Sequence, residues 1–195
     1  MPGSTRPPRD RMVYSAAQLI RSRGVSATGV RDVIAEASAP RGSFQHYFPG
    51  GKDQLIGEAL AWSGDFAARN VAAYRSTTDH PTPSGLFAHI VTQWRDELTA
   101  RRYARGCPVM ATAADLAGGD SEINRPLRDA ANRWEQAIVD ELVRMDVPAR
   151  RAQRLATLML SALEGAIMLA RIRRDPAPLD AVLTELTPLL SAASR

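Results

Sequence analysis

The sequence contains few of the residues that metal sites, redox centres and most hydrolases need. Cys107 is the only cysteine, and the 195 residues include only three histidines. A single cysteine excludes an intramolecular disulfide and a multi-cysteine metal site, and a free thiol suits a reducing compartment. No paired metal ligands, Gly-rich phosphate loop or Ser-His-Asp arrangement is present. We therefore expect no metal, no cofactor and no enzymatic activity.

Long hydrophobic runs and strand patterns are also missing. The longest apolar stretch, Leu155 to Ala170, has 16 residues and includes Glu164, whereas a membrane-spanning helix needs about 20 apolar residues. The segment from Met1 to Arg11 has no apolar core, so it is not a secretory signal. No alternating β-branched run is bounded by turn residues. These absences predict an all-α, cytoplasmic protein without a membrane partner.

Helical periodicity is present along most of the chain. Gly24, Pro40 and the Phe48 to Gly51 segment interrupt it early in the sequence, and Thr28 is placed to cap the second helix. About nine helices are expected, at roughly 9–23, 30–37, 41–47, 52–74, 84–101, 105–117, 121–145, 149–173 and 178–193. Three short helices joined by tight turns predict a helix-turn-helix head over residues 1–50, followed by a helical bundle over 51–195.

Positive charge is concentrated in the head. Residues 1–52 contain eight basic and three acidic side chains, a net charge of +5, whereas the other 143 residues contain seventeen basic and eighteen acidic side chains, a net charge of −1. This distribution points to a polyanionic partner for the first quarter of the chain.

The third expected helix has an unusual outer face. At 100° per residue, Phe44 and Phe48 share the inner side, while Gly42, Gln45 and His46 point away from it. Such a face suits a DNA major groove, because glycine permits close approach and glutamine can pair with adenine. Arg41 could reach a guanine or a phosphate, whereas Thr28, Tyr47 and Lys52 could hold phosphates at the flanks. The predicted DNA-binding residues are Thr28, Arg31, Arg41, Gly42, Ser43, Gln45, His46, Tyr47 and Lys52.

Two stretches resemble a known family. The segment from Ala27 to Ala37, followed by Ala39-Pro40-Arg41-Gly42-Ser43-Phe44-Gln45-His46-Tyr47-Phe48, closely resembles the TetR family of repressors. The elements Phe48-Pro49-Gly50-Gly51-Lys52 and Gly106-Cys107-Pro108 resemble its LmrA/YxaF-like branch. Gly29 stands where the family often has a second threonine, and Gln45 stands where tyrosine is common.

This resemblance implies a homodimeric repressor of a palindromic double-stranded DNA operator, released by a small hydrophobic effector. The last two helices are expected to form the dimer interface, because small residues recur along 149–173 and the final helix is amphipathic. Large aromatic side chains and methionines can line an adaptable apolar cavity. The candidate effector-binding residues are Trp62, Phe66, Trp94, Cys107, Met110, Trp134, Met159 and Leu163.

Two alternatives remain open at the level of sequence. An activator of the same fold would carry the same motifs, because these do not determine the sign of regulation. A non-specific DNA-binding protein would share the basic head but would show no operator preference.

Overall fold

The structure is a computed structural model that describes residues 6–116 and 122–193, without the side chain of Arg41. Within these residues it contains nine α-helices, two short 3-10 turns and no strand, which confirms the predicted all-α class. The chain divides into two compact units, Met1–Asp65 with Cys107–Ala131 and Phe66–Gly106 with Asn132–Arg195. The division falls within α4 (Gly51–Ala73) and within α7 (Asn124–Arg144).

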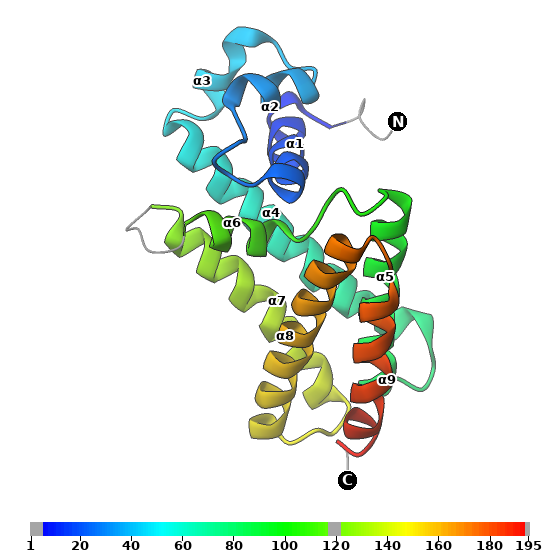
Figure 1. Cartoon of the computed structure of the whole chain (residues 1–195). Helices are drawn as coiled ribbons and strands as arrows, with labels where there is room; N and C mark the ends of the chain where they lie inside the picture. Colours follow the sequence, from blue (N-terminus) through cyan, green and yellow to red (C-terminus); the bar gives the residue numbers. More distant parts are fainter. Residues whose placement is uncertain (1–5, 117–121, 194–195) are drawn as a thin grey trace. The chain divides into compact units, whose positions relative to one another are not determined.

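The first unit is organised around α1 (Pro8–Arg23), which packs on α2 (Val30–Glu36) and α6 (Pro108–Asp115). Proline at the first helical position needs no hydrogen-bond partner for its nitrogen, and Gly24 ends the helix with a positive φ of 80°. Met12, Ala16 and Ile20 are fully buried. Figure 1 shows the three N-terminal helices, with α1 in dark blue and α2 and α3 in lighter blue.

The start of α2 differs from the prediction. Thr28 was expected to cap this helix, and that expectation was wrong, because Gly29 occupies the N-cap position without any side-chain cap. The Thr28 hydroxyl instead donates to the Gly24 carbonyl at 2.6 Å. Threonine side chains commonly form such local bonds to nearby backbone carbonyls, here four residues earlier in the chain.

Arg11 holds the other end of α2. Its Nε donates to the Ala37 carbonyl at 2.8 Å and a terminal nitrogen donates to the Ser38 carbonyl at 3.1 Å. A helix leaves its last carbonyls without intrahelical partners, so a guanidinium from α1 satisfies acceptors that α2 cannot satisfy itself. This contact fixes the point at which the chain turns toward α3.

The third predicted helix is split into two short pieces. A 3-10 turn covers Arg41–Ser43, and α3 covers only Phe44–Tyr47. Tight i to i+3 turns are common at helix starts after proline, and Pro40 precedes this one. The segment therefore has the predicted extent but a tighter first turn.

Helices α4 and α7 approach closely inside the first unit. A Cβ placed on Gly64 would lie 3.0 Å from both the Cα and the carbonyl oxygen of Ala130. A side chain at this position would require the Ala130 backbone to shift by a few tenths of an ångström, so glycine permits the close crossing.

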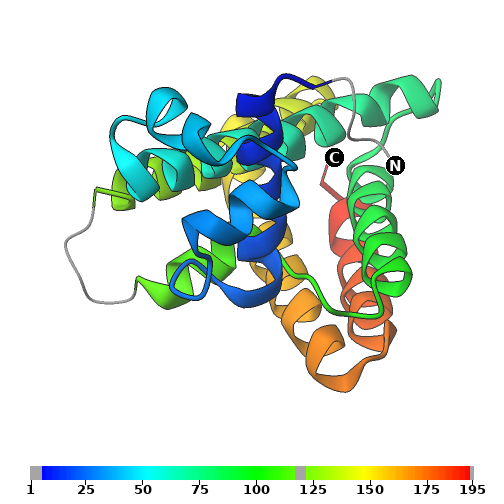
Figure 2. The ribbon, with the colours of Figure 1, turned by 90° about the horizontal axis from the view of Figure 1, so that it is seen from above.

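The second unit contains α5 (Pro83–Ala100), α8 (Ala149–Arg173) and α9 (Ala177–Ser191), and α9 packs on both others. Figures 1 and 2 show α5 in green beside α9 in red. The buried Glu141 of α7 receives hydrogen bonds from Arg75 at 2.7 Å and from Arg144 at 2.5 Å. A buried carboxylate is tolerated when its charge is paired in this way.

Helix α8 is long and apolar enough to cross a bilayer by length and composition, which the sequence analysis did not anticipate. The same criterion is met by the core helices of globular proteins. Ala152, Ala156, Met159 and Leu163 are among its buried residues, and 39% of its apolar window is buried.

Because Arg11 bonds to carbonyls at the end of α2, its substitution should destabilise the protein more than the substitution of Arg31. Arg11→Met should lower the free energy of unfolding by about 1–3 kcal/mol, because two carbonyls at the end of α2 lose a charged donor. Arg31→Met removes the same charge from an exposed side chain without a described hydrogen bond and should change stability by less than about 0.5 kcal/mol. Urea unfolding followed by circular dichroism compares the two variants, and equal losses would contradict the proposed capping.

Candidate nucleic-acid interface

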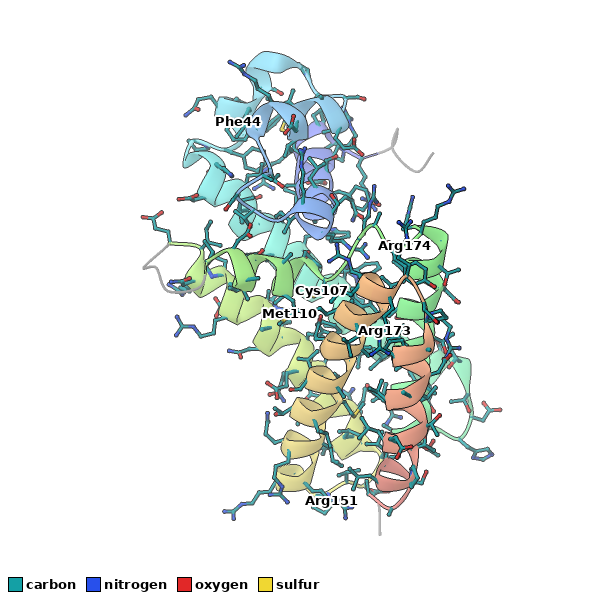
Figure 3. The ribbon with its side chains drawn as sticks, viewed as in Figure 1. Phe44, Cys107, Met110, Arg151, Arg173 and Arg174 are labelled. Atoms are coloured by element: carbon teal, nitrogen blue, oxygen red, sulfur yellow. The ribbon has the colours of Figure 1, made fainter. Side chains whose placement is uncertain are left out.

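The segment around α3 has a buried side and an exposed side. Phe48 is 0% exposed, and its ring centroid lies 5.4 Å from that of the half-buried Phe44. Gly42, Gln45 and His46 are all exposed, as the helical periodicity predicted. Figure 3 labels Phe44 on this segment.

The exposed side begins at a residue without a side chain. A Cβ placed on Gly42 would meet no atom within 4 Å, so the fold itself does not require glycine at this position. Ser43 is half-buried, and its hydroxyl donates to the Pro40 carbonyl at 2.7 Å. Gly42 therefore leaves open space at the surface, whereas Ser43 stabilises the preceding turn.

The polar side chains of α3 are only lightly restrained. The Gln45 amide nitrogen lies 3.4 Å from the Pro49 carbonyl, which is a long hydrogen bond. The His46 ring meets the half-buried Tyr47 ring edge-on, with 5.1 Å between centroids. A partner could take the Gln45 amide away from Pro49 at low cost, because that bond is weak.

The two candidates near the start of α2 differ in accessibility. Thr28 is 1% exposed, and its hydroxyl is already bonded to Gly24. Arg31, in the first turn of α2, is exposed. Of the two side chains, only that of Arg31 is free to reach a partner without a rearrangement.

Lys52 is the only lysine in the chain, and it has a structural contact. Its Nζ, from the first turn of α4, donates to the Val25 carbonyl at 2.9 Å. An ammonium group has three N–H donors, so two remain for another acceptor such as a phosphate. The side chain is half-buried, which limits the directions from which an acceptor can approach.

Other cations of the head are held by internal partners. Arg9 pairs with Glu58 at 2.7 Å, and Arg23 pairs with Asp32 at 2.7 Å. The side chain of Arg41, which was predicted to reach DNA, lies outside the described part of the structure. Several of the cations that give the head its net positive charge therefore also stabilise the fold.

Sequence reasoning did not single out Asp115, the last residue of α6. Its Oδ2 accepts a hydrogen bond from the Ser26 amide at 2.9 Å, across a separation of 89 residues. No local pattern identifies such a contact, because periodicity relates only residues a few positions apart.

The eight effector candidates fall into both units. Trp62, Cys107 and Met110 belong to the first unit, and the others belong to the second. Cys107 and Met110 lie at the beginning of α6 (Figure 3). The buried candidates are Cys107, Trp134, Met159 and Leu163. Trp62 and Trp94 are half-buried, and Phe66 and Met110 are exposed.

Two ring contacts involve these candidates. Trp62 meets Tyr14 edge-on with 5.3 Å between centroids, inside the first unit. Trp94 and Trp134 stack with 6.3 Å between centroids and an interplanar angle of 28°, inside the second unit. Such pairs supply flat apolar surface of the kind that binds aromatic or hydrophobic molecules.

Two family models match the chain. Residues 14–59 match the N-terminal model of the bacterial regulatory proteins of the tetR family. Residues 83–185, more than half of the chain, match the model of the C-terminal domain of LmrA/YxaF-like transcriptional regulators.

Relatives align over nearly the whole length. An HTH-type transcriptional regulator of Mycobacterium tuberculosis is 41% identical over 191 residues, covering 95% of each chain. YxaF of Bacillus subtilis is 27% identical and covers 93% of this chain and 94% of its own. LmrA of the same organism is 25% identical, with coverages of 88% and 90%.

The chain belongs to the TetR family.

Solved structures of TetR-family regulators have the same fold. A regulatory protein TetR from Rhodobacter sphaeroides superposes with a TM-score of 0.79 at 19% identity, covering 93% of this chain and 97% of its own. A TetR regulator from Chloroflexus aurantiacus gives 0.70 at 27% identity, covering 95% and 94%. The resemblance to the TetR family and its LmrA/YxaF-like branch is thus confirmed. The chain is a helix-turn-helix transcriptional regulator that binds DNA.

Because a Cβ on Gly42 would face open space, a substitution there in this TetR-family protein should affect DNA binding without affecting folding. Gly42→Ala should leave the free energy of unfolding unchanged or slightly raised, because the added methyl group meets nothing and the backbone gains rigidity. DNA binding should weaken by about tenfold if base edges approach this position. Thermal unfolding and a gel-shift titration measure the two effects, and unchanged DNA affinity would exclude close approach at Gly42.

Proposed function

We propose that the chain is a cytoplasmic homodimeric repressor that binds a palindromic operator and is released by a small hydrophobic effector, with no membrane partner and no catalytic activity. Residues 1–50 form the DNA-binding head, and residues 51–195 bind the effector and dimerise. The observation that supports the proposal most strongly is the exposed Gly42, Gln45 and His46 face opposite the buried Phe48.

In the proposed complex, this face enters the major groove. Gln45 pairs with an adenine, His46 donates to a base or a phosphate, and Arg41 reaches a guanine or a phosphate. Around them, Arg31, Ser43, Tyr47 and Lys52 contact the DNA backbone, which sets the orientation but carries no sequence information. Thr28 is buried, so its part is to hold the start of α2 beneath these contacts.

Dimerisation is supported by an unpartnered stripe on α8. Leu158, Ser161, Gly165, Met168 and Ile172 are all exposed and follow one another at spacings of three and four residues. That spacing keeps one face of a helix toward a partner helix. Met168 is 56% exposed and Ile172 is 72% exposed, which is unusual for large apolar side chains of a folded protein.

The centre of this stripe allows a close crossing. A Cβ on Gly165 would meet no atom within 4 Å, so the small residue is not explained by packing inside the chain. Leu189, on α9, adds another exposed apolar side chain. We assign the stripe to a second copy of this chain. Two operator half-sites separated by one duplex turn, about 34 Å, call for two heads.

The proposed effector is hydrophobic because the candidate residues are aromatic, aliphatic or sulfur-containing. The Trp94–Trp134 stack is the described contact that best fits an apolar ring. Release from DNA follows if the effector binds better to the conformation in which the two heads do not fit the operator, since a ligand shifts an equilibrium only by its preference for one state.

Selection from a random duplex library tests operator recognition. The wild type should enrich a near-palindromic sequence with two half-sites, and a non-specific binder would enrich none.

Gln45→Ala should weaken binding to the selected sequence by about tenfold to a hundredfold and relax the preference at one position per half-site. Loss of affinity without any change in the preferred bases would remove Gln45 from base recognition. A transcription assay with the selected sequence distinguishes repression from activation.

The α8 stripe predicts the effect of a charge on assembly. Met168→Glu should convert the dimer into a monomer, because each interface would bury two like charges without partners. Val143→Glu introduces the same charge at an apolar residue of α7 that is 43% exposed and lies outside the stripe. Sedimentation velocity should show a dimer for Val143→Glu and a monomer for Met168→Glu. A dimer for both variants would place the interface elsewhere.

A further inference from the structure

One peptide group in the loop between α1 and α2 is bonded at both of its polar atoms by other helices. The Val25 carbonyl accepts a hydrogen bond from Lys52 Nζ at 2.9 Å. The N–H of Ser26 belongs to the same peptide group and donates to Asp115 Oδ2 at 2.9 Å. Lys52 comes from α4 and Asp115 from α6, and all these residues lie in the first unit.

The charges of this arrangement match the peptide dipole. The cation lies at the carbonyl oxygen, the negative end, and the anion lies at the N–H, the positive end. Each hydrogen bond polarises the peptide group in the sense that strengthens the other. Bonds to charged partners are also stronger than neutral ones.

The loop is shaped to receive the Asp115 carboxylate. A Cβ on Gly24 would lie 3.0 Å from Asp115 Cγ and closer still to Oδ2. The carboxylate thus occupies the space in which any other residue would place its side chain. Gly24 also has a φ of 80°, which other residues rarely adopt.

The position of Asp115 is not explained by α6 itself. It is the last residue of an eight-residue helix, where the helix dipole and the unpaired carbonyls disfavour a negative charge. The amide of Ser26 provides the compensating interaction. A carboxylate that opposes the local preference of its own helix indicates a role in the contact between α6 and the loop.

We propose that Lys52 and Asp115 clamp the Val25–Ser26 peptide and thereby position the helix-turn-helix for its operator, with Asp115 as a positioning residue that does not touch DNA. The loop leads directly into α2, and the buried Thr28 is bonded to it twice, from its hydroxyl to the Gly24 carbonyl and from its amide to the Val25 carbonyl at 3.1 Å. The inference rests on the operator binding proposed above and adds the residues that hold the head in its binding conformation.

Both clamp helices also carry effector candidates. Asp115 ends α6, which begins beside Cys107 and includes Met110. Lys52 lies in the first turn of α4, which later carries Trp62. Helix α6 is about 12 Å long. A displacement of this helix along its axis would directly change the distance between Asp115 and the Ser26 amide. Within the first unit, the clamp therefore links the helices that carry Trp62, Cys107 and Met110 with the loop that leads into α2.

Amide hydrogen exchange in the free protein tests the clamp without DNA. Asp115→Ala should raise the exchange rate of the Ser26 amide by about tenfold or more, because its acceptor is lost. Ala17, in the buried core of α1, reports global unfolding, and the increase at Ser26 should exceed any increase at Ala17. Asp115→Asn retains an oxygen acceptor without the charge and should give an intermediate rate, which keeps the test valid if the alanine variant folds poorly.

A double-mutant cycle tests whether the two charged residues act through the same peptide. Lys52→Met and Asp115→Ala should each raise exchange at Ser26, and the double variant should show less than the product of the two increases. Gly24→Ala should likewise be better tolerated in the Asp115→Ala background, where the carboxylate no longer occupies the Cβ position. Independent effects at Ser26 would overturn the clamp.

Operator binding tests whether Asp115 positions the helix-turn-helix, because the clamp and long-range electrostatics predict changes in DNA affinity of opposite sign. Asp115→Ala removes a negative charge from a DNA-binding unit, so long-range electrostatics alone predicts tighter binding. The clamp predicts binding that is weaker by about tenfold, with an unchanged salt slope because no phosphate contact is lost. Glu36→Gln removes an exposed carboxylate of α2 and should bind no more weakly than the wild type.

The DNA probe is the duplex that the wild type selects from a random library. Binding by Asp115→Ala as tight as that of Glu36→Gln would overturn the positioning role. If the wild type selects no sequence, the proposed repressor function fails, whereas the exchange rates still decide whether the clamp exists.

Discussion

The conformation of α3 depends on the burial of Phe48. A four-residue helix is far too short to be stable alone, because helix nucleation is unfavourable and α3 contains only one turn. Its conformation is instead imposed by Phe48, which is fully buried, by the Phe44 ring beside it, and by the bond from the Phe48 amide to the Phe44 carbonyl at 2.8 Å. Because one side of the segment supplies its stability, the residues on the other side are free to be selected for a partner.

The charged side chains of the head likewise serve both the stability of the fold and the attraction of a partner. A count of basic residues gives the sign of the field, yet Arg9, Arg11 and Lys52 all have partners inside the fold. Their charges still attract a polyanion over a distance of about 8 Å at physiological salt. Their hydrogen-bonding groups, however, are partly committed before DNA arrives. We therefore expect exposed side chains such as Gln45 and His46 to make the contacts that distinguish one DNA sequence from another.

Features that depend on neighbouring residues were predictable from the sequence. The helical periodicity anticipated the exposed face of α3 and the approximate bounds of the larger helices. The Thr28 cap was wrong because Thr28 lies one residue before the N-cap, Gly29, and the path of the loop places its hydroxyl against the Gly24 carbonyl. The contacts of Arg11 with Ala37 and of Asp115 with Ser26 span 26 and 89 residues. Such contacts depend on how helices pack, which a single sequence does not reveal.

The free energy expected for the hydrogen bond between Ser26 and Asp115 is similar to the coupling free energy between two sites of an allosteric protein. A hydrogen bond to a charged group contributes about 1.5–3 kcal/mol, and the coupling free energy between two sites in an allosteric protein is typically about 1–3 kcal/mol. A change confined to one peptide group can therefore alter DNA affinity by one or two orders of magnitude without unfolding the head. A larger number of such contacts between α6 and the loop would make the switch harder to operate, because the effector would have to supply the free energy to break all of them. In the proposed clamp, the Asp115 contact with Ser26 is of the size that the binding free energy of a ligand could break.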